Sequence, residues 1–243
     1  PQMRVLVAEG PELMIRSDGD QPLRVHGLGR RDRSFQRLRV RVRGDRLALT
    51  DGGGEGHRSL QISSSDPRGI WLGQRRYHGD LLLLVRNGRI QAVNQLGIET
   101  YLPSVVGSEM PAKWPLAALQ AQAVAARTYA LRQRRGKGDF DVKATVSSQV
   151  YKGIESETPR TRKAVETTRS LVLVHNGRLI NAVFHSSSGG ATEPSGEVWQ
   201  NQLPYLVSVR DHDQHSPVHR WNQRFEAGDL RRRFRETGGV EGL

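Results

Sequence analysis

The chain has 243 residues, no cysteine and a formal net charge of +12. The absence of cysteine excludes disulfides, thiolate metal sites and thiol nucleophiles. A surface this basic favours an anionic polymer as a partner, whether nucleic acid, acidic lipid or cell-wall polymer. Aromatic residues make up only 6% of the chain, and no zinc-finger, RNP or helix-turn-helix pattern occurs. Nothing in the sequence therefore indicates specific nucleic-acid binding.

The first 78 residues are predicted to be rich in β-structure. Short apolar runs at 4–8 and 12–16 flank a Gly10-Pro11 turn, and residues 38–43 alternate apolar side chains with arginine, the period of a half-buried strand. The arginines are expected to line one solvent face, which is either a solvated sheet surface or a platform for an anionic polymer. The basic stretch 24–37 and the glycine-rich stretch 51–56 are predicted to be loops.

Two Asn-Gly pairs predict two β-hairpins. Asn87-Gly88 joins the apolar runs 80–86 and 89–94, and Asn176-Gly177 joins 171–175 to 178–184. Both central residues of such a turn need positive φ, which asparagine and glycine tolerate best. The chain thus places helical sequence between two hairpins of the same kind.

The stretch from Gly97 to Arg135 contains the most strongly predicted element. Pro115 suits the first turn of a helix, and the alanine-rich sequence after it favours about twenty helical residues. An extended segment and a tight loop over 107–111 are predicted before it. Residues 136–153 are predicted to lie irregularly over this helix. Thr158-Pro159 predicts the start of a second helix over 159–169.

These elements predict an α+β fold with antiparallel hairpins packed around one long central helix. The predicted organisation is a β-rich N-terminal region over 1–78 and a core over 79–225. An amphipathic C-terminal segment over 226–243 is expected to belong to that core.

Two other kinds of chemistry have partial patterns in the sequence. For a serine nucleophile, Ser186 to Ser188 lie beside His185, but the nucleophile-elbow pattern Gly-x-Ser-x-Gly does not occur. His212, His215 and His219 have a spacing that can bind zinc on a helix. However, they straddle a proline in a polar stretch, so surface histidines are expected. No metal and no cofactor are predicted.

Glu109 is the candidate for acid–base chemistry. A glycoside hydrolase usually needs two carboxylates, whereas a lytic transglycosylase needs one, because the C6 hydroxyl of the substrate attacks in place of water. A catalytic acid must hold its proton, which apolar surroundings favour. The sequence neighbours of Glu109 include Val105, Val106, Met110, Pro111 and Trp114. Two structural roles remain open for Glu109, namely capping a helix and pairing with Arg127.

Several motifs, in order over roughly residues 75–225, resemble the SpoIID family (stage II sporulation protein D/amidase-enhancer domain). The first group is Glu99-x-Tyr101-Leu102, Glu109-Met110-Pro111, Trp114-Pro115 and the helix Ala118–Ala130. The second group is Gln149-x-Tyr151-x-Gly153 and the segment 185–193 followed by Trp199. Residues 1–70 carry no comparable signature.

The resemblance implies action on bacterial peptidoglycan outside the cytoplasmic membrane. Glu109 would be the catalytic acid of a lytic transglycosylase that cleaves glycan strands stripped of stem peptides and leaves 1,6-anhydro-muramyl ends. The alternative is a non-catalytic glycan-binding activator of a cell-wall amidase. In either case the chain is expected to be extracytoplasmic, exported or anchored through a segment absent from this sequence.

The resemblance also implies a set of substrate-binding residues, with Glu109 facing Ser187, Ser188 and Tyr151 across an open cleft. The implied residues are Arg127, Tyr129, Gln149, Tyr151, Ser187, Ser188, Gly189 and Glu193. For Arg127 and Tyr129 a structural role is equally open. Some family members bind zinc through cysteine and histidine near the Gln-x-Tyr-x-Gly motif. Residues 144–148 contain neither, so no zinc is expected.

Overall fold

The computed structural model describes residues 1–28, 33–50, 54–134 and 136–235. The chain groups into two compact units, Pro1–Val183 and Phe184–Leu243. Among the described residues, no helix combines the length and the apolar character needed to cross a membrane.

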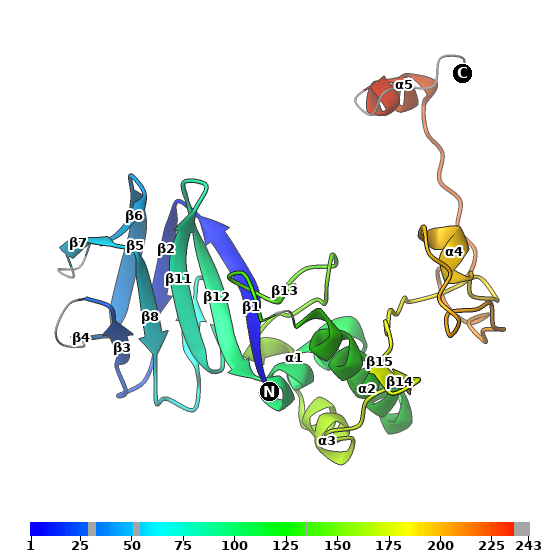
Figure 1. Ribbon diagram of the computed structural model, residues 1–243, viewed down its shortest axis with the longest axis horizontal. Coiled ribbons are helices and arrows are strands. Elements are labelled where there is room, and N and C mark those ends of the chain that lie inside the picture. Colours follow the sequence, from blue (N-terminus) through cyan, green and yellow to red (C-terminus); the bar gives the residue numbers. More distant parts are fainter. Residues whose placement is uncertain (29–32, 51–53, 135, 236–243) are drawn as a thin grey trace. The chain divides into compact units, whose positions relative to one another are not determined.

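The first unit contains two mainly antiparallel sheets (Figure 1). The first sheet has the order β13 (Val142–Lys143), β1 (Gln2–Gly10), β12 (Arg89–Gly97), β11 (Asp80–Arg86), β8 (Ser59–Ser63), β3 (Leu23–His26) and β4 (Arg33–Phe35). The second has the order β10 (Arg75–Tyr77), β9 (Ile70–Leu72), β2 (Glu12–Arg16), β5 (Arg37–Arg43), β6 (Arg46–Leu49) and β7 (Gly54–His57). With the helices below, they confirm the predicted α+β class.

Period-two patterning explains how the sheets form one core. In β5, Leu38 and Val40 are fully buried while the alternating arginines are exposed, as predicted from the sequence. Apolar side chains of the neighbouring strands meet them in one continuous cluster, whose members include Val5, Ile15, Leu47, Leu60, Ile62, Leu81, Leu83, Ile90 and Ala92.

The first Asn-Gly hairpin is confirmed. β11 and β12 pair from Asp80↔Gln95 to Arg86↔Arg89, and the turn residues Asn87 and Gly88 have φ of 51° and 70°. The second Asn-Gly turn also has positive φ at both residues, but the strands it joins, β14 (Val174–His175) and β15 (Arg178–Leu179), have only two residues each.

Two predicted loops contain strands. The 24–37 stretch contributes residues to β3, β4 and β5. Its strand β3 pairs with β8 on one side and with β4 on the other, which extends the first sheet to its edge. Residues 54–56 of the glycine-rich stretch belong to β7, which pairs with β6. Backbone pairing at a sheet edge overrides the low strand propensity of glycine there. Residues 29–32 and 51–53 of the two predicted loops lie outside the described part of the chain.

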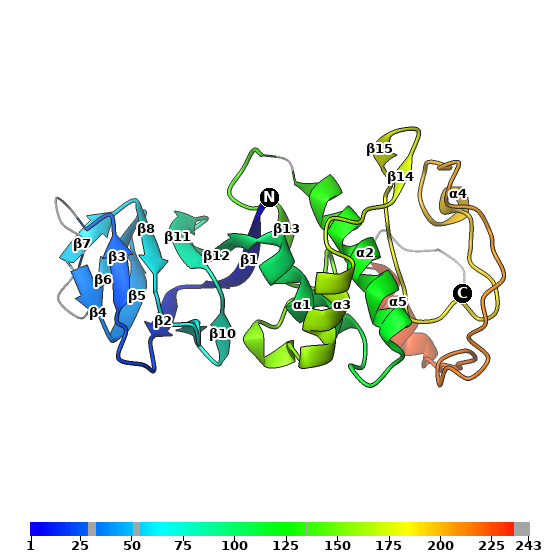
Figure 2. The same ribbon diagram turned by 90° about the horizontal axis from the view of Figure 1, so that it is seen from below.

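Three helices gather at the end of the sheets where β12 runs into α1 (Ile98–Glu109), as the first two views show (Figure 2). α2 (Leu116–Gln133) is the predicted long helix and begins directly after Pro115. Three of its six buried residues are alanine, and their small side chains let α1 and α3 (Pro159–Thr167) pack close to it. α3 begins with the predicted Thr158 cap, whose side chain accepts a hydrogen bond from the Thr161 N–H. A short 3-10 helix, η1 (Ile154–Ser156), precedes α3.

The second unit contains α4 (Ser195–Val198) and α5 (Ala227–Arg235), the latter matching the amphipathic segment seen in the sequence. The unit boundary at 183/184 differs from the predicted boundaries at 78 and 225. The N-terminal strands are continuous with the core because β1 pairs with β12, and β8 pairs with β11. No domain boundary is therefore seen at residue 78.

Candidate functional site

Glu109 is the last residue of α1 rather than part of a loop. The predicted loop over 107–111 was wrong in its first three residues, and the predicted extended segment before it is helical too. Residues Ile98, Tyr101, Leu102, Val105 and Val106 recur at helical spacing and are all buried. Met110 precedes a proline and takes an extended conformation (φ −143°, ψ 151°), which ends the helix.

The carboxylate of Glu109 is held by one backbone donor. Its Oε1 accepts a hydrogen bond of 2.7 Å from the Val150 N–H, and the side chain is half-buried. Within the described residues Glu109 forms no ion pair, so its charge is not matched by a neighbouring cation. Of the two structural roles left open by the sequence, pairing with Arg127 does not occur.

The segment from Gln149 to Lys152 runs beside the last turn of α1. The Lys152 N–H donates to the Ser108 hydroxyl at 3.3 Å, one residue before Glu109. The other end of the segment is fixed to α2, since the Gln149 side-chain amide donates to the Ala126 carbonyl at 3.1 Å. The predicted position of this segment over the long helix is thus confirmed at Gln149. Two helices jointly determine where the Val150 N–H points.

A buried tyrosine network lies beneath this segment. The Tyr101 hydroxyl donates to Gln149 Oε1 at 3.2 Å, and the Tyr151 hydroxyl donates to Asn94 Oδ1 at 2.8 Å. The two rings lie 4.9 Å apart between centroids. Burial raises the pKa of both tyrosines, and the nearby Glu109 charge adds to this effect at Tyr101. Both hydroxyls therefore stay protonated and act as donors over the physiological range.

Arg127 is buried in α2 with a side chain only 1% exposed. Its guanidinium forms a two-pronged ion pair with Glu99 at 3.0 and 2.8 Å, and it donates to the carbonyls of Leu171 and Val165. Gln149 and Tyr151 are buried as well. Arg127, Gln149 and Tyr151 therefore cannot contact a ligand directly in this structure, and they can affect it only by positioning the residues to which they are hydrogen-bonded. Tyr129 is half-buried on the same helix.

In the second unit, the loop over 187–189 wraps around Asp213. Asp213 Oδ2 accepts hydrogen bonds from the Ser188 and Gly189 N–H groups at 2.9 and 2.8 Å and a short one from the Ser187 hydroxyl. His219 Nδ1 lies 2.9 Å from Asp213 Oδ1. The Ser187 hydrogen bond, aided by the two N–H groups and the imidazole, holds the pKa of Asp213 well below its usual range.

Ser187, Ser188 and Gly189, which the family resemblance implies as substrate-binding residues, are thus engaged with Asp213 in this structure. The Ser188 hydroxyl is also occupied, since it donates to Asp211 at 2.7 Å. Sequence reasoning considered this Asp/His stretch only as a metal site. The Ser188 and Gly189 N–H groups point at the same carboxylate oxygen, and Gly189 and Gly190 both have positive φ. Successive N–H groups in such a turn favour an anion. The Ser188-Gly189-Gly190 sequence was the signal available before the structure. Glu193 is exposed.

Ser187, Ser188, Gly189 and Glu193 belong to the second unit, whereas Glu109, Gln149 and Tyr151 belong to the first. The expected position of the 187–193 loop opposite Glu109 therefore stays a prediction. In the part of the chain that the structure describes, no three His, Asp or Glu side chains are grouped so that they could hold a metal ion.

The central part of the chain is similar to known proteins. Residues 86–175 match the SpoIID family model, described as a stage II sporulation protein. The chain is 48% identical over 110 residues to a Bacillus subtilis protein named amidase enhancer, covering 45% of the chain and 15% of that protein. It is 33% identical over 163 residues to stage II sporulation protein D of B. subtilis, covering 59% of the chain and 47% of that protein.

An uncharacterized protein of Brachyspira hyodysenteriae is 34% identical over 165 residues, which cover 67% of the chain and 45% of that protein. The chain thus spans less than half the length of each of these relatives.

Proposed function

The chain belongs to the SpoIID family through residues 86–175, and we propose that it is a lytic transglycosylase that cleaves peptidoglycan glycan strands. Family membership supports a role connected with the bacterial cell wall. The proposal is narrower: the substrate is a glycan strand without stem peptides, and the product carries a 1,6-anhydro-muramyl end. An extracytoplasmic location is part of the same proposal.

The observation that carries the proposal is the setting of Glu109. A half-buried carboxylate at a helix end, oriented by one backbone N–H at 2.7 Å and paired with no cation among the described residues, suits a group that exchanges a proton with a ligand. Glu99, by contrast, is matched by the buried cation of Arg127.

The proposed reaction uses Glu109 twice. Its carboxylic acid donates a proton to the glycosidic oxygen as the bond from that oxygen to C1 of the muramyl residue breaks. The resulting carboxylate then accepts the proton of the C6 hydroxyl as the C6 oxygen forms the new bond to C1. Glu109 ends protonated as it began, and no water is consumed. One carboxylate is therefore sufficient, in contrast with hydrolysis.

The buried residues of the family motifs are proposed to position this acid. Gln149 fixes the segment that carries the Val150 N–H, and Tyr101 and Tyr151 support that segment from below. Arg127 ties α1 to α2 through Glu99. The proposed contacts to the glycan are Ser187, Ser188, Gly189, Tyr129 and Glu193. Binding through residues 187–189 would require their hydrogen bonds to Asp213 to break.

The test compares the wild-type chain with Glu109→Gln on denuded glycan strands, with anhydro products measured by mass spectrometry. Glu166→Gln, an exposed glutamate of α3 in the same unit, is the matched control. We expect product from wild type and the control, and a loss of at least about 100-fold for Glu109→Gln. Product at wild-type level from Glu109→Gln would refute the role of Glu109.

One specific observation favours a second candidate function. The relative with 48% identity is named amidase enhancer, so a non-catalytic, glycan-binding activator of a cell-wall amidase is the alternative. Glycan binding without any anhydro product from wild type, together with faster amidase turnover when the chain is added, would favour this alternative. No specific nucleic acid is proposed as a partner.

A further inference from the structure

A row of four side chains crosses the outer face of the second sheet in the first unit. The strand register places Arg76 opposite Trp71, Trp71 opposite Arg16, and Arg16 opposite Arg37, on β10, β9, β2 and β5 in turn. Residues paired in this way point to the same side of a sheet. The guanidinium groups of Arg16 and Arg76 lie 4.3 and 5.1 Å from the centroid of the Trp71 ring.

A second line of arginines runs along β5 from the end of that row. Arg37, Arg39, Arg41 and Arg43 alternate with the buried residues of the strand and are all exposed. Two residues of a strand rise about 6.7 Å, so these cations recur at that interval. We call the six residues Arg16, Arg37, Arg39, Arg41, Arg43 and Arg76 the arginine face.

Acidic groups neutralise the arginine face only in part. Arg76 pairs with Glu155 at 2.7 Å, Arg16 contacts Asp18, and Arg39 lies 3.7 Å from Glu12. The register places Glu12 on this side of the sheet, opposite Arg41. The side chains of Arg37 and Arg41 form no ion pair within the described residues. The uncompensated charge is therefore concentrated on β5.

We propose that the arginine face docks an extended, base-free phosphodiester polymer. Guanidinium groups bind phosphate oxygens through two parallel hydrogen bonds, and a ladder of them along a straight strand fits a linear chain of regularly spaced anions. Nucleic acid fits less well. Single-stranded nucleic acid uses aromatic rings as stacking platforms, and Trp71, the aromatic residue in this row, is already covered by Arg16 and Arg76. This inference is independent of the role of Glu109.

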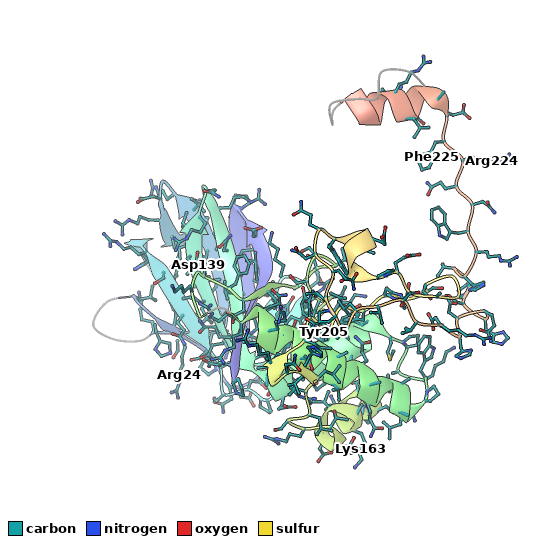
Figure 3. The ribbon with its side chains drawn as sticks, turned by 45° about the vertical axis from the view of Figure 1, so that its right-hand side comes forward. Arg24, Asp139, Lys163, Tyr205, Arg224 and Phe225 are labelled. Atoms are coloured by element: carbon teal, nitrogen blue, oxygen red, sulfur yellow. The ribbon has the colours of Figure 1, made fainter. Side chains whose placement is uncertain are left out.

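The test measures binding of the full chain to poly(glycerol phosphate) and to oligo-dT with the same number of phosphates, between about 50 and 200 mM salt. Three double variants are compared with wild type. Arg37→Gln/Arg41→Gln removes the uncompensated charges. Arg37→Lys/Arg41→Lys keeps the charge. Lys163→Gln/Arg169→Gln is the matched control, because it removes two exposed cations around α3, away from β5; Lys163 projects from α3 at the helical end of the unit (Figure 3).

We expect poly(glycerol phosphate) to bind more tightly than oligo-dT. Arg37→Gln/Arg41→Gln should weaken binding about tenfold and reduce the slope of log affinity against log salt concentration by about 1.4. The control should change the affinity less than about threefold. The Arg→Lys pair should keep the salt slope. An equal loss in the control would mean that only net charge matters and would overturn the proposal. Tighter binding of oligo-dT would replace the proposed ligand with nucleic acid.

Discussion

The Arg127–Glu99 pair can be tested for a structural role directly. Removing one partner leaves the other charge without compensation, which for a buried pair costs about 3–5 kcal/mol. We expect Arg127→Met to lower the free energy of unfolding by an amount in this range. The substitution removes the hydrogen-bond donor of the Glu99 carboxylate and of the Val165 and Leu171 carbonyls. Urea denaturation measures the change.

The control for this prediction is the exposed pair Arg86–Asp139. Asp139→Asn should cost less than about 1 kcal/mol, because exposed ion pairs contribute little. Unchanged stability of Arg127→Met, combined with loss of glycan binding, would instead assign Arg127 to the substrate.

Asp213 predicts a pH dependence for the 187–189 loop. Its folded-state pKa lies below the unfolded value of about 3.9, so the stabilisation is present above that value and is lost as the pH falls toward the folded-state pKa. Amide exchange at Ser188 and Gly189 should show constant protection from pH 7 to about pH 5, after correction for the intrinsic rate, and a loss of protection in strong acid. Asp213→Asn should raise exchange at both amides at neutral pH, while Glu197→Gln, an exposed neighbour in the same unit, should not.

Glu109 could be predicted from the sequence, whereas the Val150 N–H and Asp213 could not, for physical reasons. Glu109 stood out because one carboxylate lay among apolar residues within a specific motif. The Val150 N–H could not be predicted, because a backbone donor carries no side-chain signature. Asp213 was missed because its partners are 24 to 26 residues away along the chain and their pairing depends on loop conformation.

At the scale of elements, α1 depends on close approach at Gly107. A Cβ at this position would lie 1.9 Å from the Ser156 carbonyl oxygen, which belongs to η1. Helix propensity alone would make Gly107→Ala stabilising by about 1 kcal/mol. We expect it to be destabilising by about 1–3 kcal/mol instead, since η1 must move away. Thermal unfolding checks the sign.

Gly97→Ala is the matched control for that prediction. The backbone at Gly97 has φ −65°, and an added Cβ would meet nothing closer than the Thr100 hydroxyl at 3.8 Å. Its effect should stay within about 0.5 kcal/mol. If both variants behaved alike, the tight contact between α1 and η1 would not matter for stability.

The elements themselves were predictable where local pattern and tertiary environment agree. The Asn-Gly turns, the alternation in β5 and the alanine-rich α2 all have strong local signals. α1 was missed because Pro103 and Gly107 disfavour a helix locally. Burial of five side chains at helical spacing outweighs that preference, and their spacing was visible in the sequence.

At the scale of the whole molecule, the two units should differ in autonomy. Every residue of the hydrophobic core cluster lies between Met3 and Val165, and no described apolar side chain after Ala182 is buried. A fragment of residues 1–183 should therefore unfold cooperatively on its own, whereas 184–243 should not. Calorimetry of the two fragments tests this; a cooperative transition in 184–243 would contradict it.

The pairing of β1 has a consequence for the chain as it is synthesised. β1 leaves the ribosome well before its partners, which are β12, about 90 residues later, and β13. Arg4 of β1 also contacts Asp141, the residue before β13, at a separation of 137 residues. At about 5–20 residues per second, the apolar first strand waits roughly 7–27 seconds for its last neighbour. During this time β1 could be kept from pairing with another strand in either of two ways. A factor could shield the nascent chain, or the chain could stay extended until translation ends.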